Sequence, residues 1–113
     1  MSKQEFEPKL AAIMDAVPEC EGLIYATNTG DVIVGQTLTE MDHKAIAQGA
    51  ATILKTTIGN PLKKGVLKDV VLTMENGFAI IATNGQHMVI GILGLDGKNS
   101  IGLLSRQLKL LNA

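Results

Sequence analysis

The segment from Gly91 to Ser100 is the part of the sequence that most resembles a nucleotide-binding motif. It reads GILGLDGKNS. A phosphate-binding P-loop needs four residues between its glycines, then a lysine followed directly by serine or threonine. Its backbone N–H groups bind phosphate and its hydroxyl binds magnesium. Here five residues separate Gly91 from Gly97, and Asn99 follows Lys98 where the hydroxyl belongs. The spacing predicts the exit turn of a strand, and we expect no nucleotide binding by the chain alone.

The remaining reactive side chains form no catalytic or metal-binding pattern. His43 and His87 are the only histidines and Cys20 is the only cysteine. They fall on different predicted elements, with His43 on a helix surface, His87 at a strand edge and Cys20 on a third element. Zinc ligands, in contrast, usually come in closely spaced pairs. No serine lies in the Gly-x-Ser-x-Gly pattern of a nucleophile elbow. The sequence therefore predicts a protein that is not an enzyme and that holds no metal or cofactor.

Length and composition predict one apolar, soluble domain spanning residues 1–113. Hydrophobic residues make up 46% of the chain and charged residues only 19%. The 10 basic and 11 acidic residues form no basic stripe, which argues against a nucleic-acid partner. The longest apolar run, Met88 to Leu95, is much shorter than the roughly 20 residues of a membrane helix, so we expect no membrane insertion. A single cysteine fits the reducing cytoplasm, and oligomerisation would cover the surplus apolar surface.

The first and last segments have the periodicity of amphipathic helices. Apolar residues within 8–17 recur at i, i+3, i+4 and i+7. This helix begins either at Pro8, which suits a first turn, or earlier with Ser2 as its cap, and the sequence leaves both starts open. The last helix follows a cap at Asn99, and its apolar stripe is formed by Ile101, Leu104, Leu108 and Leu111.

A central helix is predicted from a cap at Thr39 to about Ile58, ending before Gly59. Much of its circumference is apolar, and a helix of this kind is usually covered on more than one side. The small residues around 47–51 would let a second helix approach closely. A narrow polar stripe remains, formed by Lys44, Gln48, Thr52 and Lys55.

Five segments have the composition of β-strands and are bounded by turn residues. They are 22–27, 31–37, 67–75, 78–84 and 87–94. The connections at 28–30, Asn76-Gly77 and Asn84-Gly85 read as hairpin turns. Hairpins make neighbouring strands antiparallel. The sequence therefore predicts an α+β fold in the order α-β-β-α-β-β-β-α, with a five-stranded antiparallel sheet between helix layers, a layout related to profilin and longin domains.

These features resemble the Roadblock/dynein-light-chain domain family over nearly all of the chain. The resemblance rests on the break at 18–22, the turn at 29–31, the small-residue helix at 47–51 and the closing stretch at 99–108. It implies the spatial strand order 2-1-5-4-3, with the central helix on one face and the terminal helices on the other. Family members scaffold or regulate small GTPases, form parts of lysosomal and bacterial polarity systems, or are dynein subunits, and they share no catalytic residues.

The resemblance also implies a dimer, of two copies of this chain or of one copy and a Roadblock paralogue. In that dimer the third strands pair and the central helices lie together. The third strand fits this role because it contains no proline or glycine to protect a sheet edge. The predicted dimer contact comprises Ala47, Ala50, Ala51, Leu54, Val70, Val71, Leu72, Thr73 and Met74.

The predicted function is a dimeric, non-enzymatic scaffold or regulator that binds a small Ras-like GTPase and modulates its nucleotide cycle. The partner would contact the polar stripe of Lys44, Gln48, Thr52 and Lys55. Arg106 is the only arginine and lies on the last helix, so no arginine finger is expected. The alternative is a small-molecule sensory domain with a pocket between sheet and helix. Such pockets need convergent polar groups, and the sequence shows no such cluster.

Overall fold

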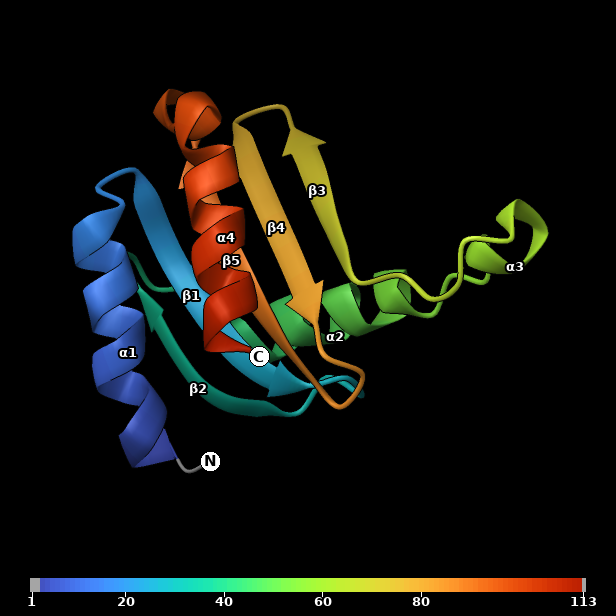
Figure 1. Cartoon of the computed structure of the whole chain (residues 1–113). Coiled ribbons are helices and arrows are strands. Elements are labelled where there is room, and N and C mark those ends of the chain that lie inside the picture. The colour runs from blue at the N-terminus through green and yellow to red at the C-terminus, as the bar shows by residue number, and fades with distance from the viewer. Residues whose placement is uncertain (1–2, 113) are drawn as a thin grey trace.

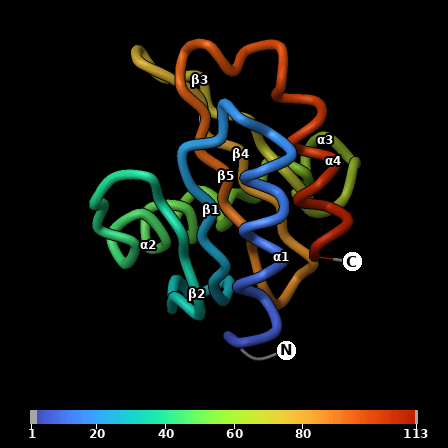
Figure 2. Tube along the Cα trace, turned by 90° about the vertical axis from the view of Figure 1, so that its left-hand side faces the viewer, coloured from blue at the N-terminus to red at the C-terminus, as the bar shows by residue number. Residues whose placement is uncertain are grey.

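A five-stranded antiparallel sheet with helices on both faces forms the structure, a computed structural model that describes residues 3–112 (Figures 1 and 2). The elements in chain order are α1 (Lys3–Ala16), β1 (Cys20–Thr27), β2 (Val32–Thr37), α2 (His43–Leu54), α3 (Gly59–Leu62), β3 (Asp69–Met74), β4 (Gly77–Thr83), β5 (His87–Gly94), the 3-10 helix η1 (Leu95–Ser100) and α4 (Ile101–Leu111). The α+β prediction is confirmed, and the one-turn helix α3 is an addition to it.

The strands lie in the order β2-β1-β5-β4-β3, as the family resemblance implied. Hairpins join β1 to β2, β3 to β4 and β4 to β5. The pairing of β1 with β5, with Ile24 opposite Ile90, closes the two halves into one sheet. This arrangement leaves β2 and β3 at the two edges.

The helices cover the two faces unequally. Figure 2 shows α1 and α4 on one side of the sheet and α2 on the other. Successive residues of a strand point to opposite faces, so Leu23 and Tyr25 join the core under α1 and α4, whereas Ile24 and Ala26 join the core under α2. Leu104 and Leu108 of the predicted α4 stripe are fully buried in the first core, and Ile101 and Leu111 pack against it.

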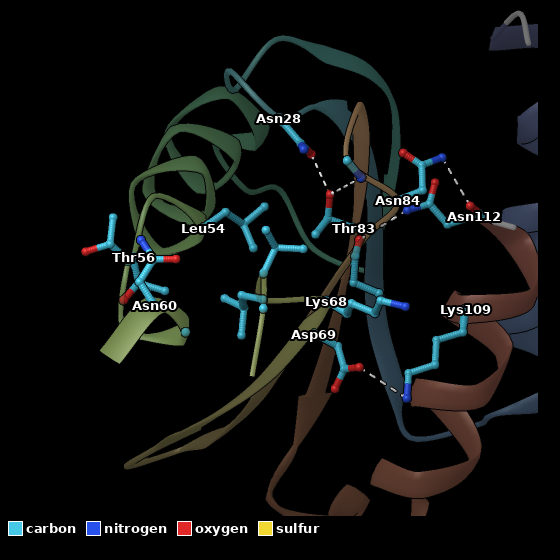
Figure 3. Close-up of a pocket in the computed structure, with 17 residues that line it drawn as sticks. Asn28, Leu54, Thr56, Asn60, Lys68, Asp69, Thr83, Asn84, Lys109 and Asn112 are labelled. Atoms are coloured by element: carbon cyan, nitrogen blue, oxygen red, sulfur yellow. Dashed lines mark hydrogen bonds and ion pairs between the residues drawn. The ribbon is translucent and has the colours of Figure 1, made fainter. Parts of the chain in front are cut away.

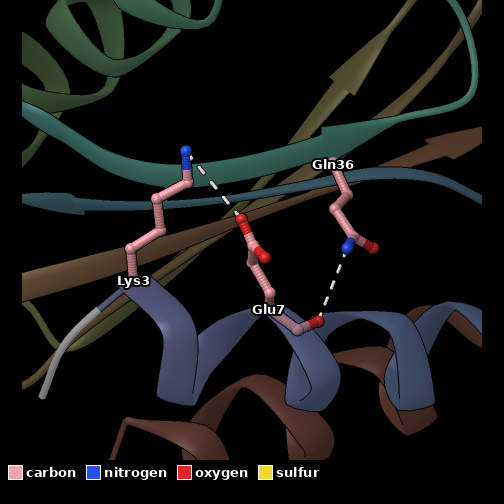
Figure 4. Close-up of polar contacts among 3 residues, drawn as sticks. All are labelled: Lys3, Glu7 and Gln36. Carbon is pink, nitrogen blue, oxygen red and sulfur yellow. Dashed lines mark hydrogen bonds and ion pairs between the residues drawn. The ribbon is translucent and has the colours of Figure 1, made fainter.

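Helix α1 continues through Pro8 and begins at Lys3, so the earlier of the two predicted starts is the one observed. The cap predicted at Ser2 lies outside the described residues. A side chain of β2 anchors the helix, because Nε2 of Gln36 donates a hydrogen bond of 3.4 Å to the carbonyl oxygen of Glu7 (Figure 4). Lys3 and Glu7 also form an ion pair of 3.8 Å along the helix.

Helix α2 differs from its predicted bounds at both ends. Its N-cap is Asp42, whose Oδ1 atom accepts a 3.0 Å hydrogen bond from the N–H of Ala45. The predicted cap, Thr39, lies in the loop before the helix, where its carbonyl oxygen accepts from the hydroxyl of Thr37. Aspartate caps a helix as well as threonine does. Because Asp42 is the cap, the helix begins later in the chain than the sequence predicted. The helix ends at Leu54, earlier than the sequence predicted.

Gly77 has a different role from the one predicted. The loop between β3 and β4 consists of the two residues before Gly77, which itself belongs to β4 and pairs with both Met74 and Gly94. Its φ is not positive. A Cβ atom at this position would lie 2.4 Å from the carbonyl oxygen of Leu93. Glycine is therefore required for the close approach of β4 to β5 and not for the conformation of the turn.

The turn predicted at Asn84-Gly85 is confirmed. Gly85 has a φ of 98°, a conformation that glycine adopts without strain. Oδ1 of Asn84 accepts hydrogen bonds of 2.9 Å from the N–H groups of Gln86 and His87, which is how asparagine stabilises such a turn. At the start of α4, in contrast, Asn99 is not the cap, since Ser100 precedes the helix and makes no capping hydrogen bond.

Candidate interaction surface

The free edge of β3 is the central feature of the candidate surface. This strand pairs with β4 on one side, and no strand of residues 3–112 pairs with its other side. Figure 1 shows it at the margin of the sheet, next to the segment that leads from α2 to α3. A sheet edge exposes a row of backbone N–H and C=O groups, and this one contains no proline or glycine that would hinder pairing. The edge is therefore competent to add a further strand.

The side chains of β3 divide between the two faces of the sheet. Val70 and Leu72 are half-buried and pack against the core under α2. On the opposite face Val71 is 42% exposed, and Thr73 beside it is also exposed. Met74, at the end of the strand, is 53% exposed. The residues predicted for strand pairing thus lie together on an accessible edge.

The three alanines predicted for the dimer contact lie between α2 and the sheet of the same chain. Ala47, Ala50 and Ala51 are buried against the chain's own sheet, beside Ile24 and Ile90. Small side chains let α2 lie close to this sheet, and they serve helix–sheet packing within the chain. Because their side chains are already covered within one chain, the contact of these alanines with a second copy stays a prediction. Leu54, the fourth predicted helix residue, is half-buried at the margin of the same core.

Ile46 and Ile53, which were not among the predicted contact residues, form what we call the apolar flank of α2. Ile46 and Ile53 are seven residues apart, so they lie on the same side of the helix. Both are half-buried at the margin of the core under α2. Exposed Ala45 and Gly49 lie near them in the helix, and neither has a side chain large enough to block an approaching helix. The i, i+7 spacing was a signal in the sequence that could have identified this flank.

The four polar residues of α2 predicted to bind a partner are all exposed. Lys44, Gln48, Thr52 and Lys55 form what we call the α2 stripe. The turn between β1 and β2 approaches the stripe at Gly30, where a Cβ atom would lie 3.1 Å from Cα of Gln48. The stripe is thus an accessible polar surface with a lysine near each end.

The two histidines and the cysteine each contact another residue within the fold. His43 was predicted to be a surface residue, but it is half-buried. Its Nε2 atom lies 3.1 Å from the hydroxyl of Thr37. His87 stacks on Tyr25 with 5.3 Å between ring centroids. Burial raises the pKa of the Cys20 thiol, which donates to the carbonyl oxygen of Gly22 at 3.3 Å. Among residues 3–112 no three His, Cys, Asp or Glu side chains are placed to hold a metal ion.

The P-loop-like segment is the exit of β5, as its spacing predicted. Residues Leu95–Ser100 form η1, which carries the chain from β5 to α4. The hydroxyl of Ser100 donates to the carboxylate of Glu19, and Lys98 is exposed. Gly97 is buried, and a Cβ atom there would lie 2.9 Å from Cβ of Leu93. The glycine thus serves packing between η1 and the strand.

Within the part of the chain that the structure describes, no helix is both long enough and apolar enough to span a bilayer.

Comparison with solved structures assigns the fold. A Roadblock/LC7 domain from Streptomyces avermitilis superposes with a TM-score of 0.80 at 14% identity, over 93% of this chain and 89% of that one. MglB from Myxococcus xanthus superposes with a TM-score of 0.78 at 10% identity, over 96% and 91%. An MglB structure with a tetrameric arrangement gives 0.74 at 10% identity, over 96% and 91%. The chain therefore has the Roadblock/LC7 fold.

In sequence, by contrast, the chain matches no family model, and no curated protein matches it.

Proposed function

We propose that this protein is a dimeric, non-enzymatic scaffold or regulator that binds a small Ras-like GTPase. The observation that carries the proposal is the unprotected β3 edge beside the apolar flank of α2. The Roadblock/LC7 fold supports it, because the family that the sequence resembles acts on small GTPases. Fold alone does not define function, so each part of the proposal rests on a surface that an experiment can test.

In the proposed dimer the β3 strands of two copies pair antiparallel across a two-fold axis. Such an interface is self-complementary, so residues near the axis meet their own counterparts. Pairing would extend the two five-stranded sheets into one, and the flanks of α2 at Ile46 and Ile53 would then lie near one another. Burial of Val71 and Met74 would add an apolar contribution to the backbone hydrogen bonds. A paralogue with the same edge is the alternative partner.

The GTPase would contact the α2 stripe, which the two-fold axis presents twice on one broad surface. Lys44 and Lys55 supply positive charge for an acidic patch on the partner. Arg106 lies on α4, on the face of the sheet opposite α2, so it is remote from this stripe. Any stimulation of hydrolysis would then come from ordering the GTPase's own switch loops and not from a donated arginine. We place this complex in the cytoplasm.

The test is to co-purify the protein with the small GTPases encoded in the same genome and to measure nucleotide hydrolysis and exchange. We expect one GTPase to be retained and its cycle to change. Retention without any change in its cycle would support a scaffold. Failure of every GTPase to bind, together with stabilisation by metabolites, would overturn the proposal in favour of a sensory domain.

A further inference from the structure

A cavity of about 710 Å³ lies beneath the segment that joins α2 to β3. Its walls come from the end of α2, the start of β3, the turn between β4 and β5, and the end of α4 (Figure 3). This volume is within the range of small-molecule sites, about 300–1,000 Å³. We call this cavity the α2–β3 pocket. It adjoins the C-terminal end of the α2 stripe, because Leu54 and Thr56 on either side of Lys55 line it, but the proposed GTPase function does not use it.

One wall of the pocket is a polar cluster that the sequence did not reveal. The hydroxyl of Thr83 donates to Oδ1 of Asn28 at 2.9 Å, and Nδ2 of Asn84 donates to the carbonyl oxygen of Asn112 at 3.1 Å. These contacts join three segments distant in sequence, which is why no local motif indicated them. The sequence shows no such cluster, which argued against a small-molecule site, whereas the folded chain contains one.

Asn112 carries an unsatisfied hydrogen-bond acceptor in this wall. Its side chain is 6% exposed, and Nδ2 donates to the carbonyl oxygens of Ala82 and His87 at 3.3 and 3.1 Å. These two bonds fix the orientation of the amide. Its Oδ1 atom is buried and has no hydrogen-bond partner within residues 3–112. Buried acceptors are almost always satisfied, so this atom is an exception among the polar groups of the described residues.

The charge of the pocket favours an anion. Nζ of Lys109 forms a 3.2 Å ion pair with Asp69, which neutralises both groups. Lys68 is exposed and forms no ion pair within the described residues. Figure 3 shows the Lys68 and Lys109 side chains on the α4 side of the pocket. An unpaired ammonium beside a neutralised pair leaves one net positive charge for a ligand.

The opposite wall is apolar and accessible. Leu54 and Leu67 are half-buried there, and Val66 is 85% exposed. A carbon skeleton can pack against this wall while its charged group contacts Lys68. The combination of an apolar wall, one unpaired cation and fixed amides is typical of a site for a small polar molecule.

We propose that the α2–β3 pocket binds a small hydroxylated organic anion, whose phosphate or carboxylate contacts Lys68 and whose hydroxyl groups contact the Asn28–Asn112 side. The probes are glucose 6-phosphate and malate, with inorganic phosphate and glucose as partial ligands. Amide chemical shifts recorded by NMR during titration should change at residues 56–68 and 83–85 with a Kd on the order of 1 mM. Glucose should produce no change, and phosphate alone should bind more weakly than glucose 6-phosphate.

The decisive comparison is between two lysine variants. Lys68→Gln should weaken glucose 6-phosphate or malate binding about tenfold or more, since it removes a charge-assisted hydrogen bond. Lys98→Gln, an exposed lysine on η1 outside the pocket, should leave binding unchanged. Equal thermal unfolding of both variants would show that the fold is intact. The proposal is overturned if none of the anions shifts these residues at about 10 mM, or if Lys68→Gln binds as tightly as the parent.

Discussion

A Cβ atom at Gly35 of β2 would lie 2.7 Å from Nδ1 of His43, because the imidazole at the start of α2 rests directly on this glycine. The contact positions the helix that carries both the α2 stripe and the apolar flank. Nε2 of the same ring lies 3.1 Å from the hydroxyl of Thr37, so the histidine is held between two residues of one strand. The placement of α2 on the sheet therefore depends on the absence of one side chain.

Gly35→Ala should destabilise the protein through this contact. The added methyl group must displace the His43 ring, and overpacking of this kind costs about 1–3 kcal/mol. Urea denaturation would measure the change in unfolding free energy. In a His43→Ala background the ring is gone, so the same substitution should cost at least about 0.5 kcal/mol less. An equal cost in both backgrounds would contradict the predicted contact.

Val71→Lys should shift the protein from dimer to monomer. In the proposed strand pairing this position lies near the two-fold axis, and like charges placed opposite one another are destabilising. Sedimentation at about 10 µM should give a mass near twice 11.9 kDa for the parent chain and near 11.9 kDa for the variant.

Leu103→Lys provides the matched control for Val71→Lys. Leu103 is 48% exposed on α4, so this substitution adds the same charge at a similarly exposed site away from the β3 edge. It should leave the dimer intact. A monomeric parent chain at this concentration would refute the proposed interface.

Lys44→Glu combined with Lys55→Glu should weaken GTPase binding while leaving the dimer unchanged. Both side chains are exposed on α2, so the substitutions invert the charge of the stripe without disturbing the core. Charge reversal at an interface rim acts mainly on the association rate, which surface plasmon resonance measures directly. The control is Lys98→Glu with Arg106→Glu, which changes the net charge equally at exposed positions on η1 and α4. Equal weakening by both pairs would indicate a nonspecific charge effect.

The buried thiol of Cys20 should make stability fall at alkaline pH. Desolvation by burial is the main reason that its pKa is raised in the folded state. Between the unfolded and folded pKa values the unfolded chain binds fewer protons, so the free energy of unfolding decreases as pH rises. The decrease should begin above about pH 8.5, the ordinary pKa of a cysteine. Urea denaturation from pH 7 to 10 would measure it.

Cys20→Ala isolates the contribution of the thiol to this pH dependence. The decrease above about pH 8.5 should be smaller in the variant. It should not vanish, because burial also raises the pKa of Tyr25, and that group ionises at higher pH. An unchanged pH profile in the variant would assign the effect to other groups.

Local sequence patterns were sufficient for the order of the elements. Strand alternation, the Asn84-Gly85 turn and the apolar spacing of α4 each arise from interactions between residues close in the chain, so their signals survive in the sequence. Boundaries were less well determined. Asp42 competes with Thr39 as a cap, and both residue types are suited to that role. Gly77 resembles a turn glycine in sequence, although contact with β5 is what requires it.

For the candidate sites, the sequence by itself determined which side chains were available, whereas the tertiary structure decided which of them are accessible. Exposure of the α2 stripe follows from helix periodicity, so the sequence was enough for Lys44 and Lys55. Burial of Ala47 depends on which face of α2 meets the sheet, and small residues suit a sheet and a second helix equally. The cluster of Asn28, Thr83 and Asn112 joins segments far apart in the chain, and only folding brings them into one pocket wall.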